Sequence, residues 1–189
     1  MKVIHLFKNE TKLIAGAAKN NRDAQQELYK KYSGKMLSVC RMYVKDLHHA
    51  EEVMLNGFFK VFKHISNFNN DGSFEGWIRK IMIREAISFL RSKKDIEFPE
   101  EIKETESHSF NNIHSEIEVE HIQQLIDALP EGYKVVFVMY AIEGYKHQEI
   151  SKMLNITEGT SKSQLFKARK MLQEKLKTQS TSDYGTVKI

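Results

Sequence analysis

The stretch EISKMLNITEGTSKSQLFKARKML, residues 149–172, has the pattern of two short helices joined by a tight turn. Thr157 precedes the second helix and can cap it by accepting a hydrogen bond from an unpaired backbone amide. Asn155 stands in the turn, where a left-handed backbone conformation is often needed and Asn tolerates it. The pattern predicts a helix-turn-helix, a unit that places one helix against a DNA duplex.

The second of these helices divides into an apolar side and a basic side. At 100° per residue, Leu165, Ala168 and Leu172 fall together and can face a core. The opposite side carries lysines, which can bind phosphates. It also carries hydroxyls and an aromatic ring, which can contact base edges or a thymine methyl. The expected DNA contacts are Thr160, Lys162, Ser163, Phe166, Lys167 and Lys170. A solvated surface helix would show the same lysines, but an outward Phe on a basic face favours a partner.

Composition limits the class of protein. The 189 residues suffice for one large or two small domains, and only 2 Pro and 9 Gly favour an all-α chain. The single cysteine, Cys40, excludes an intramolecular disulfide and predicts a buried thiol in a cytoplasmic protein. No apolar run reaches spanning length and no signal peptide precedes the chain, so we expect no membrane insertion.

Charge divides the chain into blocks. Residues 1–94 carry 18 Lys/Arg against 9 Asp/Glu, whereas residues 95–120 carry nine acids and one lysine. Two basic blocks that flank an acidic segment suit a polyanionic partner, although a solvated surface alone would also explain them. We therefore expect a helical domain at 1–94, an acidic flexible linker at 95–116, a helix-turn-helix domain at 117–177 and a polar tail at 178–189.

Helical periodicity recurs outside the acidic segment. The expected helices are about 9–18, 22–44, 47–65, 75–93, 117–128, 131–143, 147–153 and 158–177. The Asn, Asp, Gly and Ser content of 66–73 predicts a loop. The run YKVVFVMYAI, residues 133–142, is strand-like in composition, but Pro130 before it and Gly144 after it favour helix.

The helix at 50–65 is more apolar than a surface helix requires. Its stripe Met54, Phe58, Val61 and Ile65 can face the core of the domain. Leu55, Phe59 and Phe62 form a second apolar face about 100° away on the helical wheel. Either this helix lies at the centre of a bundle, or its second face docks on another protein.

The helix at 74–94 has an apolar side and a basic side that are clearly separated. Its apolar side faces the opposite way from a row of cations, and aromatic residues flank that row. Such a surface suits single-stranded or melting DNA, because bases stack on rings while cations hold phosphates. The expected contacts are Phe68, Phe74, Trp77, Lys80, Arg84, Arg91 and Lys94. The alternative is that Phe74 and Trp77 are simply core residues.

Catalytic and metal-binding patterns are missing from the sequence. His48 and His49 are adjacent and so point to different helix faces, and the remaining histidines near the acidic segment have no matching cysteine set. The sequence has no phosphate-binding glycine loop, nucleophile elbow or paired-carboxylate motif. We therefore expect no enzyme activity, no metal and no cofactor.

The doubly apolar helix at 50–65, the basic and aromatic surface at 66–94 and the basic helix-turn-helix at 149–172 follow one another along the chain. In this order they resemble the small extracytoplasmic-function type of bacterial RNA polymerase sigma factor. The likeness covers about 20–94 and 117–176. Residues 24–36 and 50–65 resemble the region that binds the polymerase clamp, residues 74–94 the region that opens and reads the −10 element, and residues 129–172 the domain that reads the −35 element.

The resemblance implies core RNA polymerase and promoter DNA as partners. It implies polymerase contacts at Glu52, Leu55, Asn56, Phe59 and Phe62, and it assigns the two DNA-contact sets above to the −35 and −10 elements. An anti-sigma factor is a further expected partner, since family members often have one. The chain departs from the family pattern at Leu55, Asn56, Arg84, Ser161 and Gln164, where Gln, Glu, Asn, an apolar residue and Arg are frequent.

A second hypothesis is a stand-alone transcriptional regulator, in which the N-terminal block serves as a sensor or dimerisation domain. Operator binding without polymerase would identify such a regulator. The cations and aromatic residues of the N-terminal block favour the sigma factor, because a sensor domain does not need them.

Overall fold

The computed structural model describes the backbone of residues 4–93, 98 and 119–183, and the side chains of residues 10–93, 98 and 122–177. Every regular element in these ranges is a helix, as predicted. The chain divides into two compact units, Met1–Lys93 and Lys94–Ile189. Within the described residues, no helix is both long and apolar enough to cross a membrane.

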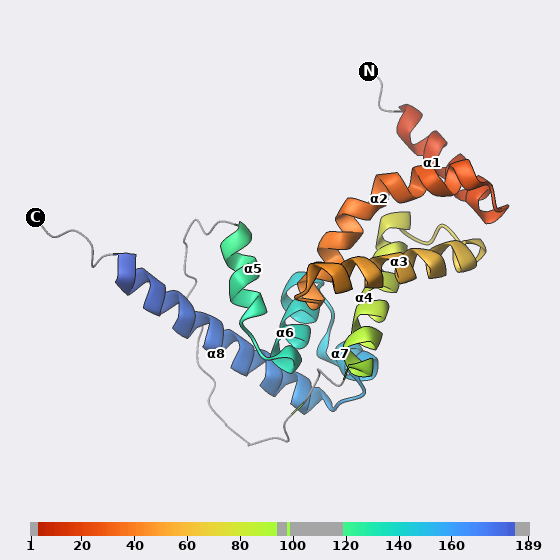
Figure 1. The fold of residues 1–189 in the computed structure, drawn as a ribbon. Helices are drawn as coiled ribbons and strands as arrows, with labels where there is room; N and C mark the ends of the chain where they lie inside the picture. Colours follow the sequence, from red (N-terminus) through yellow and green to blue (C-terminus); the bar gives the residue numbers. More distant parts are fainter. Residues whose placement is uncertain (1–3, 94–97, 99–118, 184–189) are drawn as a thin grey trace, which may run out of the picture. The chain divides into compact units, whose positions relative to one another are not determined.

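The N-terminal unit is a bundle of four helices and one short 3-10 turn (Figure 1). Its elements are α1 (Ile4–Ala18), α2 (Arg22–Tyr43), α3 (Leu47–His64), η1 (Ile65–Asn67) and α4 (Phe74–Ser92). Helices α2, α3 and α4 pack on one another, and α1 packs along α2. Asn21, Asp46 and Ser73 cap α2, α3 and α4 by accepting backbone N–H bonds of 2.9, 2.9 and 3.1 Å.

The core of this unit contains the apolar stripe that the sequence predicts for α3. Met54, Phe58, Val61 and Ile65 are all buried. Gly57 lies where α3 meets α4, and a Cβ atom at this position would overlap the Met82 sulfur. A glycine therefore permits the close approach of these two helices.

The C-terminal unit is built around one long helix. Its elements are α5 (Val119–Asp127), α6 (Glu131–Phe137), η2 (Val138–Ile142), α7 (His147–Leu154) and α8 (Glu158–Asp183). Both α6 and α7 pack on α8, and η2 continues α6 as a π-helical turn. The strand-like run 133–142 is helical, and its composition reflects burial, since Val135, Val136, Val138 and Met139 are all inaccessible.

The predicted polar tail at 178–189 is wrong over its first part. Helix α8 continues to Asp183, and residues 178–183 include no glycine or proline that would interrupt it. Apart from Phe98, the acidic linker predicted at 95–116 lies outside the described residues, as do 184–189.

Candidate nucleic-acid interface

The turn between α7 and α8 has the geometry that the sequence predicts. Asn155 ends α7 in the left-handed conformation, with φ of 55°. The Thr157 hydroxyl accepts the Thr160 backbone N–H at 2.9 Å, which caps the first turn of α8. Ile150 and Leu154 are buried and hold α7 on the core. The two helices and their turn thus form a helix-turn-helix with α8 as its second helix.

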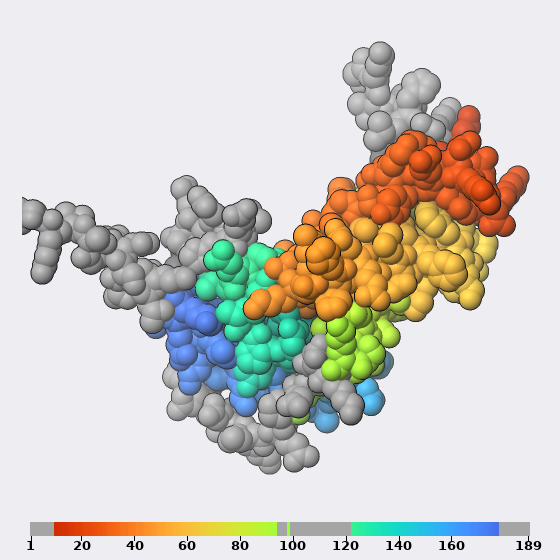
Figure 2. Space-filling model, in the orientation of Figure 1, coloured from red at the N-terminus to blue at the C-terminus, as the bar shows by residue number. Residues whose placement is uncertain are grey.

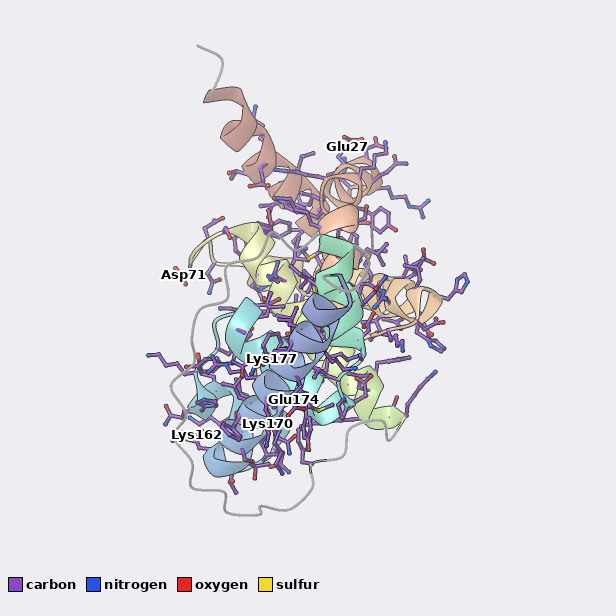
Figure 3. The ribbon with its side chains drawn as sticks, turned by 90° about the vertical axis from the view of Figure 1, so that its left-hand side faces the viewer. Glu27, Asp71, Lys162, Lys170, Glu174 and Lys177 are labelled. Atoms are coloured by element: carbon purple, nitrogen blue, oxygen red, sulfur yellow. The ribbon has the colours of Figure 1, made fainter. Side chains whose placement is uncertain are left out.

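All six residues predicted to contact DNA on α8 are accessible to solvent. Lys162 and Lys170 are exposed, and Thr160, Ser163, Phe166 and Lys167 are partly exposed. Lys162 and Lys170 lie along the same helix in the side-chain view (Figure 3). Leu165 and Ala168 are buried on the other side. The helix therefore presents cations, hydroxyls and a ring together on its accessible side, which suits phosphates and base edges.

Ser161 and Gln164, which depart from the family pattern, both lie on the buried side of α8. Ser161 is 0% exposed and Gln164 is 1% exposed. The Ser161 hydroxyl is 2.9 Å from Nδ1 of His147 on α7, whereas neither amide atom of Gln164 has a hydrogen-bond partner among the described residues. Because both residues are buried, they can influence DNA recognition only through the groups that they contact, not by touching DNA directly.

Sequence reasoning missed a cluster of three residues, one each on η2, α7 and α8. His147 stacks on Tyr140 of η2 with 4.6 Å between ring centroids, and the Arg169 guanidinium lies 5.6 Å from the centre of the Tyr140 ring. The pKa of His147 is lowered by burial and by Lys162 and Arg169, against an opposing effect of Glu158. No local signal could reveal this cluster, because it joins three separate helical elements.

On α4 the predicted cations lie on the surface of the N-terminal unit. Lys80, Arg84 and Arg91 are all exposed, whereas Ile78, Met82 and Ala86 on the opposite side are buried. The remaining predicted cation, Lys94, lies outside the described residues. The described part of α4 thus offers a basic surface for a nucleic-acid strand.

Three rings gather where the 66–73 loop enters α4. Phe68 lies 5.1 Å from Phe74 and 5.6 Å from Trp77, measured between ring centroids. Phe74 stacks on Trp77 at 5.7 Å. Phe68 and Trp77 are partly exposed, but Phe74 is only 3% exposed. Phe74 is therefore a core residue that supports the other two rings and has no free face for a base.

The loop itself has two positions in the left-handed region, Asn70 with φ of 60° and Gly72 with φ of 95°. These residues turn the chain sharply before Ser73 caps α4. The backbone N–H of Phe68 donates to the Ile65 carbonyl at 3.1 Å. The loop is thus anchored at both ends, and its exposed asparagines lie beside the partly exposed rings.

The second apolar face of α3 is exposed. Phe59 is 70% exposed and Leu55 is 54% exposed. Glu52 and Asn56 are also exposed, while Phe62 is partly buried against Phe58 at 6.0 Å between centroids. Atoms of α3, orange to gold, lie at the front surface of the N-terminal unit (Figure 2). Of the two hypotheses for this helix, its outer face favours docking of another protein.

The single cysteine, Cys40, is buried in the N-terminal unit. Burial raises the pKa of the Cys40 thiol to about 12, with a further contribution from Glu85, so the thiol stays protonated at neutral pH. Among the described residues, no group of three or more His, Cys, Asp or Glu side chains is placed to hold a metal ion.

Comparison with known proteins identifies both units. Residues 28–96 match the family model of sigma-70 region 2, and residues 120–172 match that of sigma-70 region 4. Together the two matches cover well over half of the chain.

Two curated proteins are similar over most of their length. The RNA polymerase sigma-H factor of Pseudomonas aeruginosa is 26% identical over 181 residues, which cover 88% of this chain and 93% of that protein. The ECF RNA polymerase sigma factor SigW of Bacillus subtilis is 27% identical over 179 residues, covering 88% and 96%.

A solved structure described as CnrH in complex with the cytosolic domain of CnrY matches with a TM-score of 0.49 and 17% identity, covering 88% of this chain and 96% of that one. Since both sigma-70 regions are matched in the expected order and ECF sigma factors align along nearly the whole sequence, the chain belongs to the sigma-70 family of RNA polymerase sigma factors, in its extracytoplasmic-function (ECF) group.

Proposed function

We propose that this sigma factor divides promoter reading between its two units. As a member of its family it binds core RNA polymerase and directs promoter-specific transcription initiation, and sigma factors are initiation factors rather than enzymes. In the proposal, the C-terminal unit reads the −35 element and the N-terminal unit reads and holds open the −10 element. The observation that carries it is the accessible basic side of α8 beside a correctly formed turn.

At the −35 element, α8 enters the major groove with its first turns. Lys162, Lys167 and Lys170 bind backbone phosphates, while Thr160, Ser163 and Phe166 face the base edges. The Ser163 hydroxyl donates to the Thr160 carbonyl at 3.0 Å, which leaves its oxygen able to accept a hydrogen bond from a base amino group.

At the −10 element, the basic side of α4 holds the phosphates of the non-template strand through Lys80, Arg84 and Arg91. Lys94, two residues after the end of α4 in the sequence, is proposed as a fourth phosphate contact. Phe68 and Trp77 offer ring faces to unpaired bases, and the 66–73 loop holds a flipped base, which costs only a few kcal/mol to unstack. Phe74 takes part indirectly, by supporting both rings from the core.

The polymerase docks on the outer face of α3. Leu55 and Phe59 supply the apolar centre of this interface, and Glu52, Asn56 and Phe62 lie around it. An exposed aromatic ring at the centre of an apolar patch is typical of a binding hot spot. An anti-sigma factor that covered the same face would exclude the polymerase, and competition between the two for the chain would reveal it.

Transcription from a pool of random-sequence templates tests whether the chain directs initiation from promoters that contain both a −35 and a −10 element. Purified bacterial core polymerase is used with and without the chain, and the transcript starts are sequenced. We expect starts only with the chain, downstream of shared −35 and −10 motifs. A chain that binds one DNA motif alone and is indifferent to core polymerase would instead be a stand-alone regulator, and the proposal would be wrong.

A further inference from the structure

His147 lies on α7 and contacts residues of both α8 and η2. It is the first residue of α7, its Nδ1 lies 2.9 Å from the hydroxyl of buried Ser161 on α8, and its ring stacks on Tyr140 of η2. A hydroxyl can donate to a bare nitrogen or accept from a protonated one, so Ser161 holds the ring in either charge state. The imidazole is therefore fixed in orientation relative to the recognition helix.

The other ring nitrogen is available. His147 is partly exposed, and within the described part of the chain its Nε2 has no hydrogen-bond partner. Ser161, which holds the ring, directly precedes Lys162, the exposed cation proposed to bind a phosphate at the start of α8. An oriented N–H donor next to a phosphate-binding lysine is suited to a second phosphate.

We propose that His147 contacts a phosphate of the −35 element through Nε2, and that it takes up a proton when the DNA binds. This inference rests on the function proposed above and adds a contact to it. It also explains why a polar residue, Ser161, occupies a fully buried position on α8: its hydroxyl orients the imidazole toward the backbone of the DNA.

The charges around the imidazole set the direction of the proton uptake. In the DNA-free chain, burial and the cations Lys162 and Arg169 lower the pKa of His147, with Glu158 opposing them, so the ring is neutral at pH 7. At the start of α7, the Glu149 carboxylate accepts the backbone N–H of Lys146, the residue before the helix, at 2.8 Å. A bound phosphate adds a negative charge beside Nε2 and thereby favours the imidazolium.

Two consequences are measurable. Binding to the −35 element strengthens as the pH falls from 8 to 6, with an upper limit of about tenfold per pH unit for one proton. The slope of log affinity against log salt also becomes steeper at pH 6 by about 0.9, because one more ionic phosphate contact has formed.

The test uses the full chain with core polymerase and a −35 duplex selected from a random pool, at pH 6 and pH 8 over a range of salt. His147→Gln keeps an N–H donor near the position of Nε2 but cannot become charged. His147→Asn keeps a group near Nδ1 for Ser161 but cannot reach the phosphate. His48→Gln is the matched control, since His48 has a 91% exposed side chain in the N-terminal unit.

We expect the wild type and His48→Gln to share the same pH and salt response. His147→Gln should bind as the wild type does at pH 8 and lose the gain at pH 6, whereas His147→Asn should bind more weakly at both. A pH response that persists in His147→Gln overturns the inference but leaves the proposed function intact. Failure of the wild type to select any −35 sequence overturns both, and a wild type whose binding does not respond to pH overturns the inference even if the variants do not fold.

Discussion

At the scale of single residues, the accessible lysines of α8 determine how strongly DNA binding depends on salt. Replacing Lys162 and Lys167 with Ala should lower the slope of log affinity against log salt by about 0.9 for each lost phosphate contact. Binding of a −35 duplex by the polymerase complex, measured over a range of salt, gives this slope directly.

Lys177→Ala is the control for this experiment. Lys177 is exposed on the same helix, but it lies ten residues beyond Lys167, or about 15 Å along the helix axis. Its replacement should leave the slope unchanged. If the Lys162 and Lys167 variants also keep the wild-type slope, these lysines are not part of the DNA interface.

At the scale of elements, the packing of α3 on α4 depends on Gly57. Gly57→Ala places a Cβ atom against the sulfur of Met82, whose side chain is completely buried and cannot move away freely. We expect a loss of about 1–2 kcal/mol in the free energy of unfolding, because the overpacking outweighs the better helix propensity of Ala. Trp77, the only tryptophan, reports unfolding of this unit by its fluorescence.

Gly34→Ala provides the matched comparison. Gly34 is exposed in the middle of α2, and a Cβ atom there would meet nothing within 4 Å. This substitution should stabilise the unit by up to about 1 kcal/mol. Equal effects of the two substitutions would mean that the helices do not approach as closely at Gly57 as described.

We expect charged substitutions on the outer face of α3 to weaken binding of the polymerase. Leu55→Asp or Phe59→Asp should weaken association with core polymerase by about 30-fold or more, because each places a charge in the apolar centre of the proposed interface. Both side chains are exposed, so neither variant should lose stability. Titration of labelled chain with core polymerase measures the affinity.

Leu47→Asp separates a specific interface from a general effect of surface apolar residues. Leu47 is 51% exposed and begins the same helix, but it lies two turns before Leu55. Its replacement should change the affinity less than about threefold, as expected for a residue outside a binding hot spot. Equal losses for Leu47 and Phe59 variants would contradict the assignment of the docking face.

At the scale of the whole molecule, the two units should contribute independently to promoter binding. Lys162→Ala acts on the −35 contact of one unit, and Arg84→Ala acts on the −10 contact of the other. Since the two residues lie in separate units and contact separate promoter elements, their free-energy losses in open-complex stability should add within about 0.5 kcal/mol. A double variant that loses no more than either single variant would show that both residues act at one site.

Local chemistry explains why much of the fold could be predicted. The capping Thr157, the left-handed Asn155 and the turn residue Gly144 each act through hydrogen bonds or backbone angles within a few residues of themselves. The buried stripe of α3 follows from helical periodicity in the same way. The predicted end of α8 is wrong, because the polar residues after 177 are compatible with helix and continue it to Asp183.

The sequence by itself determined the helices, the Thr157 cap, the turn before α8 and which side of that helix is basic, because these depend on neighbours in the chain. Only the tertiary structure decided which groups are buried. It places Phe74 in the core beneath Trp77, leaves Phe59 exposed, and buries Lys134 completely with its Nζ 2.8 Å from Glu131. It also brings His147 to Ser161, fourteen residues away. Burial and such contacts depend on packing between helices, and residues distant in the chain supply that packing.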